Sequence, residues 1–255
     1  MGLYDGVVPE RFFPEIGVAG FSHIDGTVAF YSIIAAALEP SFHLLEFGAG
    51  RGEHISDDPV VYRKSLSNFR GRVQRVVGAD VDPVVASNPY VDQAVVLTPG
   101  APLPFEDAAF DMIVSRYVFE HIDQAEETAR ELMRVLKPGG LLCAVTPNKW
   151  GYVAIGARLV PNRLHAKALT RVQPGRHQQD VFPTRYRMNS MGSLRRLFGK
   201  YGHVMIYRAS GEPAYYLGRM LPYAAFLLLH KLLPRPLATA IQLFVRKSAA
   251  TADAK

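Results

Sequence analysis

The sequence predicts an α/β protein whose doubly wound, mostly parallel sheet lies between two layers of helices. Three observations lead to this prediction. An apolar segment, 44–47, runs directly into alternating glycines at 48–52, and a second apolar segment, 75–79, ends in an acid. Further along, a helix with a basic end stops at Pro138-Gly139-Gly140 before another apolar run. Apolar strands that alternate with helices in this order are typical of parallel sheets.

The first motif, Leu44–Gly52, predicts a buried strand followed by a turn that brings backbone close to a nucleotide. A dinucleotide fingerprint, G-x-G-x-x-G, would require a glycine at the position occupied by Glu53. A carboxylate at Glu46, just before the turn, suits a ligand with a cationic amine and repels a diphosphate. A nicotinamide dehydrogenase is therefore disfavoured. Taken alone, the loop is also compatible with ordinary glycine turns.

The second motif is a short strand, Arg75–Asp80, that ends in a carboxylate. In nucleoside-binding α/β sheets an acid at the tip of the second strand accepts hydrogen bonds from both ribose hydroxyls. Asp80 is the better candidate because it directly follows the apolar run. Asp82 is expected to cap the next helix ahead of Pro83.

Two more motifs follow in order. Residues 103–122 predict a turn, then a fourth strand and the start of a helix. Residues 131–145 predict a helix that stops at Pro-Gly-Gly, followed by a fifth strand. Together, the four motifs of residues 44–147 resemble those of the class I S-adenosylmethionine-dependent methyltransferases. The resemblance implies a Rossmann-like methyltransferase fold with seven strands, the last of them antiparallel. It also implies S-adenosyl-L-methionine as cofactor and no metal.

Carried onto this sequence, the family's motifs imply a set of cofactor-binding residues at the ends of the strands: Glu46, Gly48, Ala49, Gly50, Asp80, Val81 and Arg116. No side chain is assigned to the adenine, because the third strand leads into Thr98-Pro99-Gly100-Ala101 rather than into an acid.

The donor's sulfonium already activates the methyl group, so in-line placement of the acceptor is the main requirement, and a base helps when the acceptor is a hydroxyl. Tyr117 and His121 follow the fourth strand and are weak catalytic candidates. A histidine near a helix start more often satisfies local backbone groups. Four residues before the first strand are expected either to close over the cofactor or to lie in the core: Phe21, His23, Phe30 and Tyr31.

We divide the chain by these motifs into five parts: an N-terminal helical cap over the cofactor (1–40), the cofactor-binding core (41–147), a basic substrate-side segment (148–200), the sixth and seventh strands with an apolar helical insertion at 213–237 (201–247), and a disordered tail (248–255). A polar insertion, 53–72, lengthens the first crossover. Both the basic segment and the apolar insertion are expected over the carboxyl end of the sheet.

Bulk properties fit one enzyme domain with additions. The 255 residues are 49% hydrophobic, which suffices for one large α/β core. The single cysteine, Cys143, excludes an intrachain disulfide and favours a reducing compartment. The first residues lack the basic head and apolar core of a signal peptide. A cytoplasmic location is expected, with the inner face of the membrane as an alternative.

Basic residues are concentrated in the segment 148–200, which holds eleven Lys or Arg against one acid. Its net charge is +10, so the rest of the chain carries −4. The segment leaves the predicted fifth strand at the rim of the ligand crevice, where it would steer an anionic substrate or membrane phosphate; nucleic acid is not favoured. A solvated face without a ligand is the alternative. Within it, 180–189 is interpreted as a substrate-side loop.

The insertion 213–237 is aromatic and aliphatic, but its uninterrupted apolar run is about half of the roughly 20 residues that span a bilayer. It could cap an apolar substrate, lie in a membrane interface, form a dimer contact, or be an additional core helix.

The sequence thus predicts a methyltransferase that acts on a small, lipid-like or glycan-like, anionic acceptor, with peripheral membrane contact as a further expectation. The alternative is a non-catalytic S-adenosylmethionine-binding module that serves regulation or assembly. Oligomeric state is left open.

Overall fold

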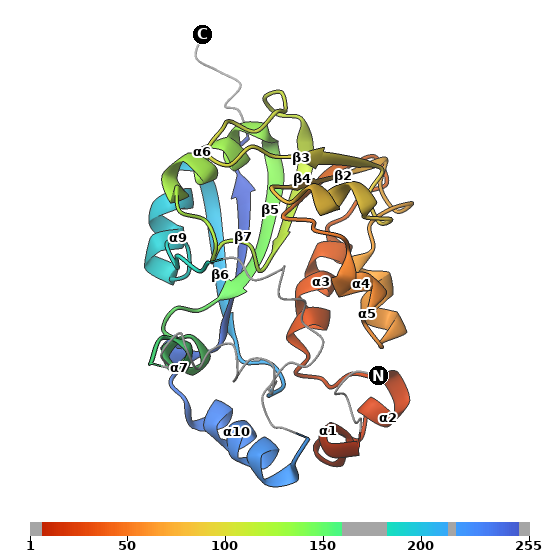
Figure 1. Ribbon diagram of the computed structural model, residues 1–255, viewed down its shortest axis with the longest axis vertical. Coiled ribbons are helices and arrows are strands. Elements are labelled where there is room, and N and C mark those ends of the chain that lie inside the picture. The colour runs from red at the N-terminus through yellow and green to blue at the C-terminus, as the bar shows by residue number, and fades with distance from the viewer. Residues whose placement is uncertain (1–6, 160–182, 214–217, 250–255) are drawn as a thin grey trace.

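The fold is that of a computed structural model, which describes residues 7–159, 183–213 and 218–249. Seven strands form one sheet in the order β3-β2-β1-β4-β5-β7-β6 (Figure 1). They are β1 (His43–Phe47), β2 (Arg75–Asp80), β3 (Gln93–Val96), β4 (Phe110–Arg116), β5 (Leu136–Pro147), β6 (Gly202–Ala209) and β7 (Ala240–Lys247). Only β7 runs antiparallel to its neighbours, β5 and β6. The predicted seven-stranded, mostly parallel sheet with an antiparallel last strand is confirmed.

Helices cover both faces of the sheet and extend past the end at which the parallel strands finish (Figure 1). The α-helices are α1 (Val7–Phe12), α2 (Ile16–Ala19), α3 (Gly26–Ala36), α4 (Glu53–Ser56), α5 (Val61–Ser67), α6 (Ala125–Val135), α7 (Tyr152–Leu159), α9 (Met191–Phe198) and α10 (Met220–Leu232). Short 3-10 turns are η1 (Pro83–Ser87), η3 (Gly199–Tyr201) and η4 (Arg235–Leu237). Asp82 caps η1 as predicted, because its carboxylate accepts a hydrogen bond from the Val84 N–H at 2.9 Å.

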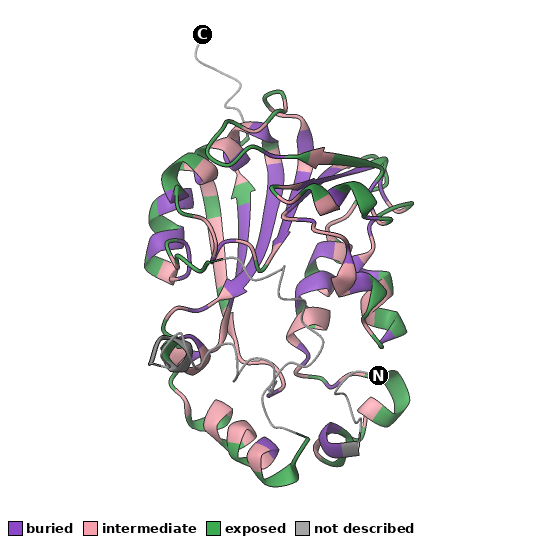
Figure 2. Ribbon diagram, in the orientation of Figure 1, coloured by how far each residue is buried: buried purple, intermediate pink, exposed green. Residues whose placement is uncertain are grey.

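Each face of the sheet has its own apolar cluster, so the molecule has three layers. On one face, α6 turns the stripe Ala125, Ala129 and Leu132 onto the strands, and α9 joins the same cluster. On the other face, α3 contributes Phe30 and Tyr31, which are 1% and 2% exposed. Phe30 and Tyr31 therefore lie in the core, which was one of the two roles expected for them. Figure 2 shows the buried residues concentrated in the central strands.

The junction between α6 and β5 differs from the sequence prediction, which placed the helix stop at Pro138-Gly139-Gly140. The helix ends at Val135, and Leu136 already pairs with Phe110 of β4. The Pro-Gly-Gly segment instead lies inside β5, where the pairing register with β4 shifts. Gly139 has a φ of 77°, a left-handed conformation that glycine adopts without the usual steric cost.

The N-terminal helices and the apolar insertion pack together at the carboxyl end of the parallel strands (Figure 1). Val8, Phe13 and Tyr223 are the buried members of this third cluster, and the rings of Phe12 and Tyr223 lie 5.1 Å apart. We call α1, α2 and α10 the composite cap. It joins segments that are about 200 residues apart in the sequence, as the contact between Arg11 and Met220 shows.

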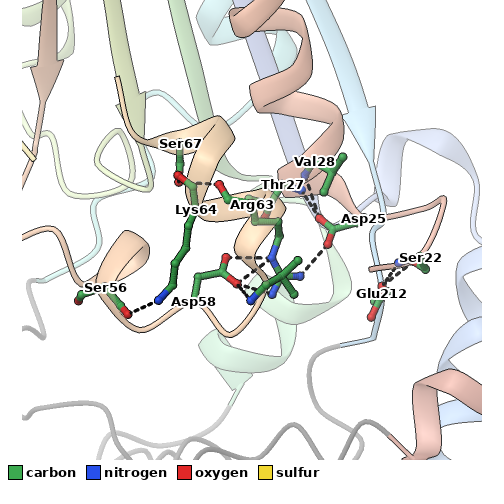
Figure 3. Close-up of polar contacts among 11 residues, drawn as sticks. Ser22, Asp25, Thr27, Val28, Ser56, Asp58, Arg63, Lys64, Ser67 and Glu212 are labelled. Carbon is green, nitrogen blue, oxygen red and sulfur yellow. Dashed lines mark hydrogen bonds and ion pairs between the residues drawn. The ribbon is translucent and has the colours of Figure 1, made fainter. Parts of the chain in front are cut away.

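Polar contacts fasten the entrance to α3, as Figure 3 shows. The Asp25 carboxylate caps α3 and pairs at 2.7 Å with Arg63 of α5, which also forms an ion pair with Asp58. Nearby, the Ser22 hydroxyl donates a hydrogen bond to Glu212, which follows β6. The start of the chain is therefore tied both to the first crossover and to the β6–α10 connection.

The described parts of the basic segment 148–200 lie in two different places, although its composition is uniformly basic. Residues 160–182 lie outside the described part of the chain, whereas α7 lies at the carboxyl end of the sheet (Figure 1). The segment's last part, α9, packs on a sheet face, because Leu194, Leu197 and Phe198 are buried in the main cluster. Among the described residues, no helix combines the length and apolar character needed to cross a membrane.

Candidate active site

The three glycines after β1 are required for two different reasons. All three have positive φ: 79° at Gly48, 49° at Gly50 and 82° at Gly52. A Cβ on Gly48 would lie 2.1 Å from the Val118 side chain, and one on Gly52 would lie 2.6 Å from Tyr90. Around Gly50, apart from its own atoms and its two chain neighbours, no atom of the described residues lies within 4 Å of the corresponding point. The outer glycines thus allow close packing, while Gly50 presents bare backbone to open space.

Asp80 holds the glycine loop in place. Its Oδ2 accepts a hydrogen bond from the Gly50 N–H at 2.8 Å, and its Oδ1 accepts one from the Asp82 N–H at 2.9 Å. The Asn88 amide donates to the carbonyls of Ala49 and Gly50, both at 3.1 Å. A carboxylate has about four acceptor positions, so Asp80 retains the capacity to accept two ligand hydroxyls.

A cleft of about 280 Å³ opens where β1, β2 and β4 end, and we call it the cofactor cleft. It is lined by Gly48, Ala49, Gly50, Arg51, Gly52, Glu53, His54, Asp80, Asp82, Val84 and Arg116. Five of the seven residues that the family motifs implied are in this set: Gly48, Ala49, Gly50, Asp80 and Arg116. Glu46 and Val81 are not among the lining residues.

Glu46 lies within β1 and is 6% exposed. Its Oε2 has no hydrogen-bond partner within the described part of the chain. Burial raises the pKa of this carboxyl to about 8, so the acid is largely protonated at neutral pH. The predicted attraction to a cationic amine requires Glu46 to be ionised. The bound amine would therefore have to favour loss of the proton from the Glu46 carboxyl.

Val81 follows the tip of β2 and is 42% exposed. The valine that lines the cofactor cleft is instead Val84, on η1. The implied role of Val81 in cofactor binding stays a prediction.

Sequence reasoning missed His54, which α4 places in the cleft wall. Desolvation by burial, with the nearby Arg116 cation as a second cause, lowers its pKa to about 3. His54 is therefore neutral at physiological pH and can act as a hydrogen-bonding group. Its position two residues after the glycine run was the available signal.

The two weak catalytic candidates lie outside the lining of the cofactor cleft. Tyr117 adopts a φ of 54° and is 43% exposed, with the Arg116 guanidinium 5.0 Å from its ring centre. His121 Nδ1 lies 3.1 Å from the Pro183 carbonyl, and its Nε2 lies 3.9 Å from a Glu120 oxygen. The contacted carbonyl is 62 residues away in the sequence, so it is not one of the local backbone groups considered for His121, and its catalytic role stays a prediction.

The described part of the substrate-side loop is fastened to the same turn. The backbone N–H groups of Arg185 and Tyr186 both donate to the Glu120 carbonyl, at 2.6 and 3.1 Å. Residues 180–182 lie outside the described part of the chain.

A second hollow, of about 320 Å³, lies beyond the end of β5. It is lined by Asn148, Lys149, Trp150, Ser190, Met191, Gly192, Arg208 and Pro236. The Lys149 ammonium lies 5.0 Å from the Trp150 ring centre, and Trp150 is 53% exposed. The hollow combines two cations with an accessible aromatic ring.

A family model described as "Methyltransferase domain" matches residues 45–144. The match runs from β1 into β5 and contains the glycine loop, Asp80 and Arg116. Residues 45–144 therefore carry a methyltransferase domain, similar to that of relatives named S-adenosylmethionine-dependent methyltransferases. The cofactor of such domains is S-adenosyl-L-methionine.

Individual relatives agree with this assignment. A Mycolicibacterium smegmatis protein named "Probable S-adenosylmethionine-dependent methyltransferase" is 35% identical over 83 residues, which are 30% of this chain and 31% of that protein. The chain spans about a third of the length of the curated relatives it matches.

Among solved structures, a methyltransferase from Thermotoga maritima is similar with a TM-score of 0.55 at 13% identity, covering 94% of this chain and 96% of its own. The geranyl diphosphate C-methyltransferase of Streptomyces coelicolor, crystallised with S-adenosyl-L-homocysteine, has a TM-score of 0.50 at 16% identity, covering 86% of this chain and 75% of its own. At these identities the similarity is one of fold.

Proposed function

We propose that this protein transfers a methyl group from S-adenosyl-L-methionine to a small acceptor that is anionic and partly apolar. The observation that carries the proposal is the neighbourhood of two hollows at one edge of the sheet: the cofactor cleft and the cationic, aromatic second hollow. A donor and an acceptor need such adjacent sites.

The cofactor cleft fits the methyl donor by its chemistry. Gly50 presents backbone with no side chain in the way, and Asp80 offers acceptor oxygens to ribose hydroxyls. Arg116 would attract a carboxylate, and the orphaned Oε2 of Glu46 would gain a partner in an ammonium group. When bound, the cofactor supplies a methyl group on a sulfonium centre.

The second hollow suits the acceptor by charge and by position. Lys149 and Arg208 supply two cations, and Trp150 supplies an apolar face. Within the sheet, β4 separates β1 from β5, and neighbouring strands lie about 4.8 Å apart. The ends of β1 and β5 are therefore about 10 Å apart, while Arg208 lies on β6, two strands beyond β5. Geranyl diphosphate, named for the Streptomyces enzyme, is an anionic acceptor with an apolar tail on a related fold.

Neither His54 nor Arg116 would serve as a strong general base at neutral pH. A His54 with a pKa of about 3 is a weak base, and Arg116 is a cation. Methyl transfer would therefore depend on placement of the two reactants rather than on proton abstraction by either of these side chains.

Calorimetry with S-adenosyl-L-methionine and its demethylated product tests the cofactor site. Asp80→Ala removes two ligand hydrogen bonds to a charged acceptor, each about 1.5–3 kcal/mol before water compensates. Asp107→Ala, whose side chain is 80% exposed, is a control that should bind normally. Unchanged affinity in Asp80→Ala and in Gly50→Val would reject the cleft.

Mass spectrometry of lipid and polar extracts, incubated with isotopically labelled methyl donor, tests transfer. We expect label in an acidic, partly apolar product. A Lys149→Ala/Arg208→Ala variant should bind cofactor normally yet transfer more slowly. Tight cofactor binding with no labelled product in any fraction would instead favour the regulatory or assembly module.

A further inference from the structure

Helix α10 has two apolar faces, and its inner face is fully used by the protein. Tyr223 is completely buried against the N-terminal helices. One turn further, Phe226 stacks on Tyr152 of α7 at 5.8 Å, and His230 lies 2.8 Å from the Tyr152 hydroxyl. These contacts fix the orientation of α10 on the molecule, so the direction of its opposite face is also fixed.

The opposite face carries a stripe that faces solvent. Leu221, Leu228 and Leu232 are 84%, 57% and 72% exposed, and Ala225 between them is exposed as well. Their spacing of four, three and four residues places them along one side of the helix. A surface helix ordinarily presents polar residues there, so a continuous apolar stripe marks an interaction surface. We call these four residues the outer stripe.

Only cations accompany the outer stripe on its own segment. Residues 213–237 contain Arg219, Lys231 and Arg235 and no acidic residue, and all three cations are exposed. Arg11 of α1 adds a fourth, with its guanidinium 3.0 Å from the Met220 sulfur. A symmetric dimer through the stripe would bring these like charges together. A negatively charged partner complements them.

We propose that the outer stripe of α10 docks on an anionic membrane surface, with the leucines in the interface and the flanking cations at lipid headgroups. Helices that lie in the interface combine an apolar face with Lys and Arg in this manner. With 13 residues, α10 is too short to cross a bilayer, which takes about 20. The inference is independent of methyl transfer and goes beyond it.

Docking would also set the orientation of the whole sheet. The composite cap and α7 lie at the end where the parallel strands finish (Figure 1), which is the end that carries both hollows. A membrane under α10 would therefore lie on the acceptor side of the molecule.

Sedimentation of the full chain with vesicles tests the proposal. We compare phosphatidylcholine vesicles with phosphatidylcholine–phosphatidylglycerol vesicles, at low and high salt. Binding should require the anionic lipid and weaken with salt. The variant Leu221→Gln/Leu228→Gln/Leu232→Gln should bind about 100-fold more weakly because it loses its buried apolar area. Each of Arg219→Gln, Lys231→Gln and Arg235→Gln should weaken binding about five-fold.

Val61→Gln on α5 is the matched control, because Val61 is 80% exposed but far from α10 in sequence and outside the cap. The cofactor affinity of each variant is measured as well, and an unchanged affinity shows that the fold is intact. Equal vesicle binding by wild type and the triple leucine variant would overturn the proposal. So would light scattering that shows a dimer which the triple variant dissociates, since the stripe would then bind a second copy.

Discussion

The cofactor cleft and the composite cap lie at the same end of the sheet, yet they are built from contacts of different range. In the cleft, the loop after β1 is held by the tip of β2, which is its neighbour in the sheet, through Gly48 N–H to the Ala79 carbonyl and Gly50 N–H to Asp80. In the cap, Arg11 contacts Met220 across 209 residues of sequence. The cleft is thus formed by neighbouring strands of the sheet, whereas the cap forms only when α10 meets helices that lie about 200 residues earlier in the sequence.

The comparison predicts different kinds of unfolding for two equally buried aromatic side chains. Phe198→Ala removes a ring from the main cluster and should lower global stability by about 3–5 kcal/mol. Tyr223→Ala removes a similar area from the cap cluster, so its main effect should be local opening of α1 and α10. Hydrogen exchange read by mass spectrometry distinguishes them. Equal loss of protection throughout the sheet in both variants would show that cap and sheet unfold as one unit.

Within the cleft, Gly48 and Gly50 should respond to alanine in opposite ways. Gly48→Ala combines positive φ with a clash against Val118 and should cost about 2–5 kcal/mol of stability. Gly50→Ala meets no atom and should cost about 1 kcal/mol, but it should weaken cofactor binding about ten-fold. Denaturant unfolding and calorimetry on both variants give the four values. A Gly50→Ala protein with normal cofactor affinity would contradict the placement of the ligand.

Glu46 links the stability of the sheet to pH. Its pKa is raised to about 8 in the folded protein, above the ordinary 4.5, so the folded state binds the extra proton between these values. Stability should therefore fall as pH rises from about 4.5 to 8, by a few kcal/mol at most. Glu46→Gln should lack this decline while binding the cofactor more weakly. Urea unfolding across this range is the measurement, and identical slopes for both proteins would contradict a buried, protonated Glu46.

The smallest expected effect concerns α9, the part of the basic segment that belongs to the sheet. Its capping box joins Ser190 and Ser193, with each side chain accepting a bond from the other's backbone N–H. Ser190→Ala should cost about 1 kcal/mol, and Ser56→Ala at an exposed site should cost less. Thermal unfolding measures both. No change in Ser190→Ala would mean that packing alone holds α9.

The sequence was a good guide to the sheet because each motif is local. A strand, its terminal acid and the following cap lie within a few residues, as at Asp80 and Asp82, and the structure shows both where they were expected. The predicted helix end at Pro138-Gly139-Gly140 was wrong, because proline and glycine occur both where a helix ends and where a strand has a bulge.

The composite cap could not be predicted in the same way. The periodicity of α1 does not indicate that Phe13 will contact Tyr223. That contact depends on how the sheet positions two segments that are distant in the sequence. His54 was overlooked for a related reason: its place in the cleft depends on how α4 turns after the glycine loop. Charge counts likewise could not separate α9, which covers the sheet, from the part of the basic segment beyond β5.

The pairing of α1 with α10 has a consequence for synthesis on the ribosome. Translation releases α1 before α10, and the buried partner Tyr223 emerges about 200 residues after the helix that it covers. During that interval Val8 and Phe13 lack the part of their cluster that α10 supplies, Tyr223 and Leu227, so they remain more accessible to chaperones and proteases. The cap is therefore complete only after translation has passed α10, and a chain truncated before α10 would leave the apolar side of α1 uncovered.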